Sequence, residues 1–201
     1  MAWRPLLLAA ATLGISACTT SGVTRPASVT VAEGGGFTIT EEVRVGAGVR
    51  NDFERALHLL AQEDYESGIA LLVEVTEAAP FVTTPHIDLA IAYGHVNDLE
   101  RAEASIKAAL ELNPRHPVAL NELGIIYRKS GRFTEARASY EKALELYPDF
   151  HFARRNLAIL CDIYLADPEC ALENYQRYTA AVPDDEAAAM WIADLRARAG
   201  K

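Results

Sequence analysis

The stretch from His116 to Pro148, HPVALNELGIIYRKSGRFTEARASYEKALELYP, decides the fold of this chain. Its last residue belongs to a series of prolines, because Pro80, Pro114 and Pro148 follow one another at a constant interval of 34 residues. Small and large side chains recur at the same interval. The recurring sets are Gly68, Ala102 and Ala136; Leu72, Ile106 and Tyr140; Ala56, Ala90 and Gly124; and Leu59, Tyr93 and Tyr127. A period of this length indicates a repeated supersecondary unit.

The residues of the quoted stretch are those that a pair of antiparallel helices requires. We expect Gly124 and Ala136 to lie where the two helices touch, because only small side chains fit there. Tyr140 would fill the space beyond them. Gly131 permits a tight turn between the helices, and Pro148 ends the second helix. The stretch therefore predicts one helical hairpin.

This pattern resembles the tetratricopeptide repeat, over roughly residues 50–200. The resemblance implies an all-α solenoid of about four helix-turn-helix repeats, wound as a right-handed superhelix, with a C-terminal capping helix. One such hairpin cannot bury its apolar face alone, so neighbouring repeats share a continuous core. Members of the family usually hold peptides or helices in a concave groove. We therefore expect a protein-interaction scaffold.

The expected hairpins follow from the repeat register. The first begins near Asn51 or Asp52, either of which can cap a helix, and ends near Ala79. The others span about 83–113, 116–147 and 151–181, and the domain as a whole spans 49–201. The fourth contains an extra residue, which we expect in the turn at 166–169. A last amphipathic helix then carries Met190, Trp191, Ile192 and Leu195, and its polar outer side would seal the end of the solenoid.

The beginning of the chain predicts export. Residues 1–17 combine a positive start, a short apolar run and small residues at the end, which describes a signal peptide. Ile15-Ser16-Ala17-Cys18 resembles a bacterial lipobox, which implies lipidation (palmitate included) at Cys18. The alternative is an ordinary signal peptide cut near Ala17, with Cys18 incidental. Thr19 stands where Asp favours the inner membrane in similar Gram-negative lipoproteins, so we expect the periplasmic face of the outer membrane.

Residues 18–48 read as a lipidated, extended tether. Up to Gly36 they are rich in Thr, Ser, Val and Gly, which favours a flexible chain. Residues 37–45 alternate apolar and polar side chains, which is a strand signal. A single strand could lie extended on the helices, add to the sheet edge of a partner, or remain disordered.

Charge and cysteine usage narrow the possible partners. The chain has a formal net charge of −9, and removal of residues 1–17 with Arg4 makes it about −10. Because nucleic acids and anionic lipids bind Lys and Arg, both are poor candidates as partners.

Cys161 and Cys170 remain as an even pair in an oxidising compartment, and we expect a disulfide between two antiparallel helices. The alternative is two buried free thiols. A metal site is not expected, because no histidine has suitable spacing.

The family resemblance also implies which residues meet a partner, since the first helix of each repeat lines the groove. Position nine of these helices gives an apolar ladder: Leu57, Ile91, Ile125 and Ile159. Position five gives Phe53, Ile87, Asn121 and Arg155, and the edge carries His95, Arg128 and Lys129. This arrangement suits an amphipathic or apolar segment with some acidic character. Alternatively, the ladder packs between hairpins, and Arg128 and Lys129 are an ordinary solvated helix end. Ile87, Ile91 and Glu122 occupy positions where some members grip a C-terminal carboxylate, so that activity is not implied.

The sequence offers no evident catalytic site. Its five histidines are scattered, and no phosphate loop or nucleophile elbow occurs. We expect no enzyme, cofactor or small-molecule substrate, and contact with a membrane only through the lipid. The leading hypothesis is a lipoprotein that docks one component of an envelope assembly, such as pilus, secretion, cell-wall or energy-transducing machinery. The alternative is a chaperone-like periplasmic binder of exported apolar segments.

Overall fold

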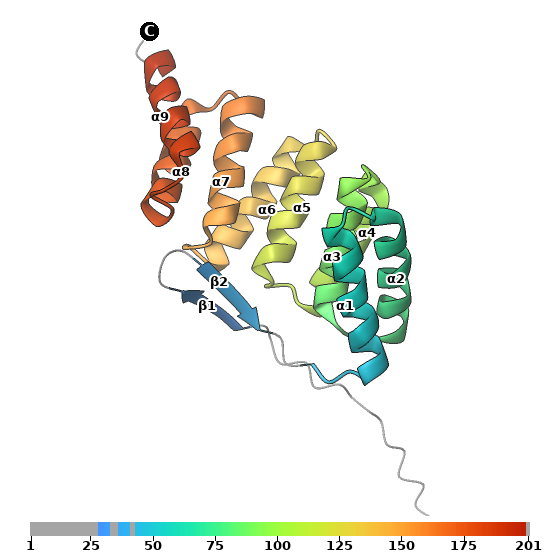
Figure 1. Ribbon diagram of the computed structural model, residues 1–201. Coiled ribbons are helices and arrows are strands. Elements are labelled where there is room, and N and C mark those ends of the chain that lie inside the picture. Colours follow the sequence, from blue (N-terminus) through green and yellow to red (C-terminus); the bar gives the residue numbers. More distant parts are fainter. Residues whose placement is uncertain (1–27, 33–35, 41–42, 200–201) are drawn as a thin grey trace, which may run out of the picture.

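The computed structural model describes residues 28–32, 36–40 and 43–199 (Figure 1). The predicted signal peptide, Cys18 and Thr19 lie outside the described residues. The described elements are β1 (Ser28–Ala32), β2 (Gly36–Thr40), α1 (Ala47–Ala61), α2 (Tyr65–Ala78), α3 (Thr83–His95), α4 (Leu99–Leu112), α5 (Pro117–Lys129), α6 (Phe133–Leu146), α7 (His151–Ile159), the π-helical segment η1 (Leu160–Tyr164), α8 (Pro168–Ala181) and α9 (Glu186–Ala199). No described helix is both long and apolar enough to cross a bilayer.

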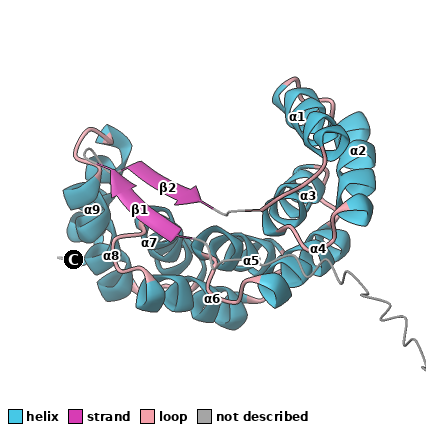
Figure 2. Ribbon diagram, turned by 90° about the horizontal axis from the view of Figure 1, so that it is seen from below, coloured by secondary structure: helices cyan, strands magenta, loops and turns pink. Residues whose placement is uncertain are grey.

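The helices pair as hairpins and stack side by side into an arc. Helices α1, α3, α5, α7 and α9 form the inner layer, and α2, α4, α6 and α8 form the outer layer (Figure 2). The closest pairings are the hairpins α1–α2, α3–α4, α5–α6 and α7–α8, and each hairpin also contacts the next. The described helices therefore form the expected all-α solenoid of four hairpins, with α9 as an additional terminal helix.

The N-terminal segment departs from the expected single strand. Residues 36–40 do form a strand, but it pairs antiparallel with β1, so that Val29 lies opposite Ile39 and Val31 opposite Phe37. Residues 28–32 thus belong to a β-ribbon and not to the extended tether. The ribbon lies on the inner side of the arc, near the start of α7 (Figures 1 and 2). Both strands alternate apolar and polar residues, and a strand is stable only when it pairs with another.

Helix α1 begins earlier than expected. It starts at Ala47 with Gly46 at the N-cap position, and no side chain caps it. Asp52, one of the two expected caps, lies inside the helix and accepts a hydrogen bond from Arg55 at 2.9 Å. The residues before Asn51 are compatible with a helix, so nothing local forces a start at the polar pair.

The turn inside each hairpin has one residue in the left-handed region of backbone space. These residues are Glu63, Asn97, Gly131 and Ala166. The first three follow one another at 34 residues and the last at 35, so the extra residue of the fourth hairpin lies before Ala166. The prediction that it lies in the turn at 166–169 is wrong. It is accommodated in η1, since a π-helical turn contains one residue more than an α-helical turn.

Two clusters of buried side chains form one core along the arc. One extends from Ala56 to Ile126 and the other from Leu120 to Leu195, and both pack against Leu110, Val118 and Leu123. At the third hairpin, Tyr140 is fully buried and lies against Gly124, as the sequence predicts.

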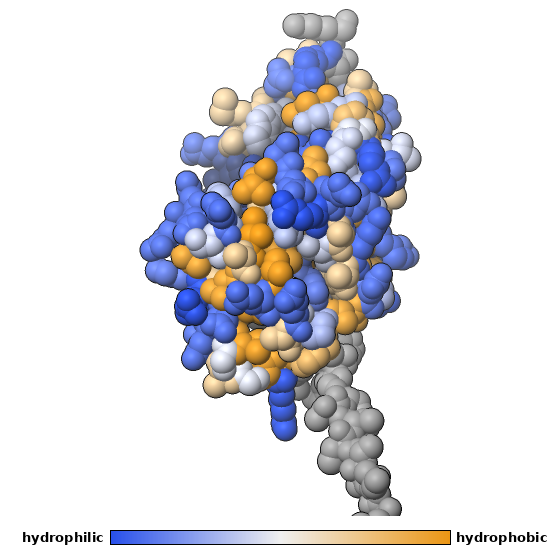
Figure 3. All heavy atoms as spheres, turned by 90° about the vertical axis from the view of Figure 1, so that its right-hand side faces the viewer, coloured by the Kyte–Doolittle hydropathy of each residue, from blue (hydrophilic) through white to orange (hydrophobic). Residues whose placement is uncertain are grey.

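The two ends of the solenoid are closed differently. At the start, Arg55 takes the place of Leu89 and Leu123, and its side chain is 70% exposed beside Asp52. Seen from this end, hydrophilic and hydrophobic side chains are interspersed (Figure 3). At the other end, α9 buries Ile192 and Leu195 against the preceding hairpin. Asp185 caps α9 by accepting the backbone N–H of Ala188 at 3.1 Å.

Candidate partner-binding face

The predicted apolar ladder lies on α1, α3, α5 and α7, one residue on each helix. These helices form the inner layer of the arc (Figure 2). Leu57 is 39% exposed, and Ile91, Ile125 and Ile159 are half-buried. The three isoleucines pack against the core and still keep part of their surface in solvent. The two interpretations of the ladder therefore each hold in part. It packs between hairpins and also forms an apolar strip that a partner can reach.

The four residues at position five are not equally exposed, since Phe53 and Arg155 are half-buried. Ile87 and Asn121 are buried, with exposed fractions of only 4% and 5%, so they support the face from below and offer little contact surface. The Asn121 side chain donates to Glu122 at 3.1 Å and accepts from Asn156 on α7 at 2.9 Å. The bond with Asn156 joins the inner helices of neighbouring repeats, and together the two bonds explain why an amide is buried there.

The predicted basic residues already have partners within the chain. Arg128 donates to the Tyr164 hydroxyl at 3.3 Å, and Lys129 donates to the backbone carbonyl of Gly94 at 2.8 Å. Arg155 lies over the ring of Trp191, with 5.6 Å between the guanidinium carbon and the ring centroid. The three cations therefore tie neighbouring hairpins together, and the interpretation of Arg128 and Lys129 as an ordinary solvated helix end is incomplete.

Two carboxylates lie on this face, and sequence reasoning assigned neither of them a binding role, although it named Glu122 as a residue that does not fit a carboxylate-gripping site. Asp88 on α3 and Glu122 on α5 hold the same position in successive repeats and are both half-buried. Burial raises the pKa of Asp88 to about 6. Burial raises the pKa of Glu122 to about 7, against the opposing effects of Asn121 and Lys129. The repeat interval could have revealed these two carboxylates, because the acidic residues Glu54, Asp88 and Glu122 follow one another at 34 residues.

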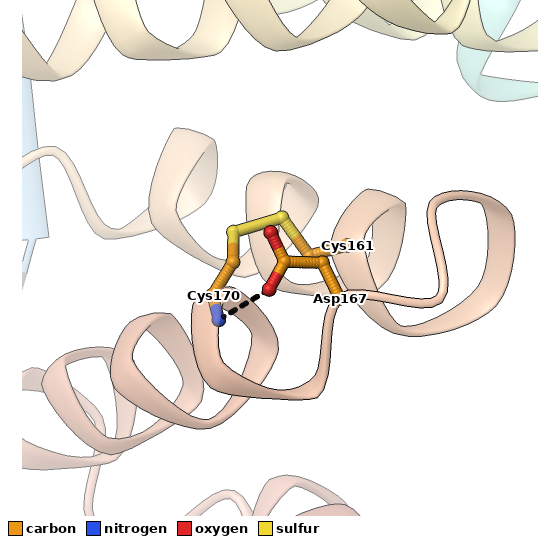
Figure 4. Close-up of side chains that lie close together, drawn as sticks. All are labelled: Cys161, Asp167 and Cys170. Atoms are coloured by element: carbon orange, nitrogen blue, oxygen red, sulfur yellow. Dashed lines mark hydrogen bonds between the residues drawn. A yellow bond between two sulfur atoms is a disulfide. The ribbon is translucent and has the colours of Figure 1, made fainter.

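Cys161 and Cys170 form a disulfide that joins the start of the π-helical segment to α8 (Figure 4). Their Cα atoms are 5.9 Å apart. The Asp167 carboxylate lies beside the sulfurs, where it accepts the backbone N–H of Cys170 at 3.1 Å and caps α8. Because the two sulfurs are bonded to each other, neither is a free thiolate that could bind a metal ion. Cys161, Asp167 and Cys170 therefore have a structural role.

Comparisons with known proteins agree with this architecture. Residues 87–149 match a family model described as tetratricopeptide repeat. The Photosystem I assembly protein Ycf3 of Synechococcus sp. (strain CC9605) is 34% identical over 92 residues, which cover 46% of this chain and 49% of that protein. The chain thus spans about half the length of this curated relative.

Three solved structures have a similar fold. PilF of Pseudomonas aeruginosa aligns with a TM-score of 0.68 and 21% identity, over 75% of this chain and 68% of its own. MamA of Desulfovibrio magneticus RS-1 aligns with a TM-score of 0.68 and 18% identity, over 78% of this chain and 88% of its own. The first repeat domain of Spaghetti (RPAP3), bound to the HSP90 peptide SRMEEVD, aligns with a TM-score of 0.56 and 24% identity, over 59% of this chain and 93% of its own.

Proposed function

We propose that this chain is a non-catalytic scaffold of the tetratricopeptide-repeat type that docks one component of a cell-envelope assembly on its concave face. The observation that carries the proposal is the apolar ladder. Buried apolar side chains need no partner, but half-buried ones in a strip on a concave wall gain free energy when a partner covers them. One similar structure holds a peptide, and the curated relative is named as an assembly protein, which supports this class of function.

The partner can be captured from native envelopes. Cross-linked pull-downs would compare the wild-type protein with a variant carrying Ile91→Asp and Ile125→Asp, after circular dichroism has shown that the variant folds. We expect one dominant partner that the variant loses, because two charges in the ladder would have to be buried on binding. If the variant does not fold, the milder pair Ile91→Ala and Ile125→Ala replaces it.

A matched control places the same two charges on the outer layer. Leu112 on α4 and Ala138 on α6 are both exposed, so Leu112→Asp and Ala138→Asp add equal charge away from the concave face. We expect this control to keep the partner. Retention of the partner by the folded ladder variant would contradict binding at the ladder, and many weak partners in place of one would favour the chaperone-like alternative.

The envelope location is a separate part of the proposal. It is supported by residues 1–18, which resemble a lipoprotein signal, and by the disulfide, which is typical of proteins from oxidising compartments. We propose that lipid chains on Cys18 hold the protein on the periplasmic face of the outer membrane. Cys18→Ser should then move the protein out of the membrane fraction, and mass spectrometry of the wild-type N-terminal peptide should show the acyl groups. An unmodified Cys18 would refute the anchor.

A further inference from the structure

Two carboxylates lie beside the apolar ladder. Asp88 precedes Ile91 by three residues on α3, and Glu122 precedes Ile125 by three residues on α5. Residues three apart are neighbours on a helix surface, so each carboxylate adjoins a ladder isoleucine. Within the described part of the chain, neither carboxylate has an ion-pair partner.

Some other acidic residues of the protein have ion-pair partners. On the outer layer, Glu103 contacts Lys107 at 2.7 Å and Arg132 at 2.8 Å, and Glu141 contacts Arg137 at 2.8 Å. Lys129 is a possible neighbour of Glu122 on α5, but its ammonium group donates to the carbonyl of Gly94. Asp88 and Glu122 differ from these acids because they are half-buried without an ion pair, on the inner layer where a partner is proposed to bind.

A half-buried carboxylate without a counter-ion is costly when it is ionised. The raised pKa values of Asp88 and Glu122 are the measure of that cost, and burial is the first cause of both. A lysine or arginine side chain of a partner would compensate for the lost hydration of the carboxylate by donating charge-assisted hydrogen bonds to it. The apolar ladder beside the two carboxylates would exclude water from these bonds and strengthen them.

We propose that the concave face receives a segment of a partner protein whose apolar side chains cover the ladder and whose lysine or arginine side chains pair with Asp88 and Glu122. This inference rests on the proposed function and specifies the chemistry of its partner. It differs from the expectation of a partner with acidic character, because Arg128 and Lys129 are engaged within the chain.

Binding of this kind depends on pH. The partner's cation favours the ionised carboxylates, so the complex forms with release of the protons that Asp88 and Glu122 carry in the free protein. Affinity is therefore full above about pH 7 and falls as the pH drops through about 7 and then about 6. The groups that act on Glu122 are Asn121 and Lys129 on the same helix and Tyr140 on α6. For Asp88, burial is the cause found in the described part of the chain.

The test uses two synthetic peptides of roughly 14 residues, with leucines at helical spacing and either lysine or glutamate at all other positions. Binding of each labelled peptide to the disulfide-intact protein would be measured by fluorescence anisotropy between pH 5.5 and pH 8. The variant carries Asp88→Asn and Glu122→Gln, which keep the side-chain shapes and remove the charges. A matched control carries Glu74→Gln and Glu111→Gln, two exposed positions on the outer helices α2 and α4 with the same change in net charge.

We expect the lysine peptide to bind at least about tenfold more tightly than the glutamate peptide at pH 8, and to lose about tenfold in affinity by pH 5.5. The Asp88→Asn, Glu122→Gln variant should lose both effects, and the matched control should keep them. Equal binding of the two peptides, no binding of the lysine peptide, or an unchanged pH profile in the variant would overturn the inference.

The ladder variant separates this inference from the proposed function. If Ile91→Asp with Ile125→Asp abolishes binding while Asp88→Asn with Glu122→Gln does not, the concave face binds partners and the proposed role of the carboxylates is wrong. If the folded ladder variant binds the lysine peptide as the wild type does, both the proposed function and this inference fail.

Discussion

At the scale of single residues, the contact between Gly124 and Tyr140 shows how little freedom the hairpin has. A methyl group added to Gly124 would lie within 3.0 Å of three atoms of the Tyr140 ring. That ring has no exposed surface and is enclosed by the core, so it has nowhere to move. The two helices can therefore approach each other only because position 124 lacks a side chain.

Replacement of Gly124 by Ala should lower the free energy of unfolding by about 1–3 kcal/mol, because overpacking outweighs the better helix propensity of Ala. Urea denaturation measures the change. Gly94→Ala on α3 is the matched control, since no atom lies within 4 Å of the added methyl group. It should be neutral or stabilise by up to about 1 kcal/mol. Equal effects at the two glycines would contradict the packing argument.

At the scale of elements, the helices depend on short local signals at their starts. Asp64, Asp98 and Asp167 each cap the second helix of a hairpin by accepting a backbone N–H three residues on. Arg132 holds the equivalent place before α6 and provides no such bond. Helix α5 is capped in another way, because the buried His116 ring accepts the backbone N–H of Ala119 at 3.3 Å through Nδ1.

The cap on α5 predicts a pH-dependent stability. Burial lowers the pKa of His116 to about 4, and the cap needs the neutral ring, whose nitrogen is an acceptor. In the unfolded chain the His116 ring takes up a proton near pH 6.5, whereas in the folded chain it does so only near pH 4. The contribution of the neutral His116 ring to the free energy of unfolding is therefore complete above pH 6.5 and is lost as the pH falls to about 4. The loss should reach up to about 3 kcal/mol in the free energy of unfolding.

Replacement of His116 by Asn keeps a capping side chain and removes the titration. Denaturation of this variant between pH 4 and pH 7 should show a smaller loss of stability than that of the wild type. The exposed His58 on α1 gives the control, and His58→Asn should retain the slope of the wild type. An identical slope in the His116→Asn variant would show that the cap does not titrate in this range.

At the scale of the whole molecule, the stacking of hairpins turns an interval in the sequence into a surface. Helices α1, α3, α5 and α7 follow one another on the inner side of the arc (Figure 2). Each carries one of the four residues of the apolar ladder. The same stacking places Asp88 and Glu122 beside it. Arg128 and Lys129 link hairpins to each other, so the concave face is held in shape by the cations that sequence reasoning assigned to a partner.

The sequence by itself determined the repeat. The 34-residue interval of Pro80, Pro114 and Pro148 and the small residues at 124 and 136 specify hairpins, because helix ends and close helix contacts are local requirements. The cysteine pair was predicted for the same reason, since antiparallel helices bring Cys161 and Cys170 together. For these residues, the residue type and the spacing along the chain are enough to predict the structural role.

Only the tertiary structure decided the degree of burial and the pairing. Ile87 and Ile91 are the same residue type one turn apart, yet Ile87 belongs to the buried core and Ile91 is half-buried and packs against that core. The pairing of β1 with β2 depends on two separated segments. The raised pKa values of Asp88 and Glu122 come from burial, and the burial of these side chains is a property of the folded chain that no local pattern in the sequence specifies.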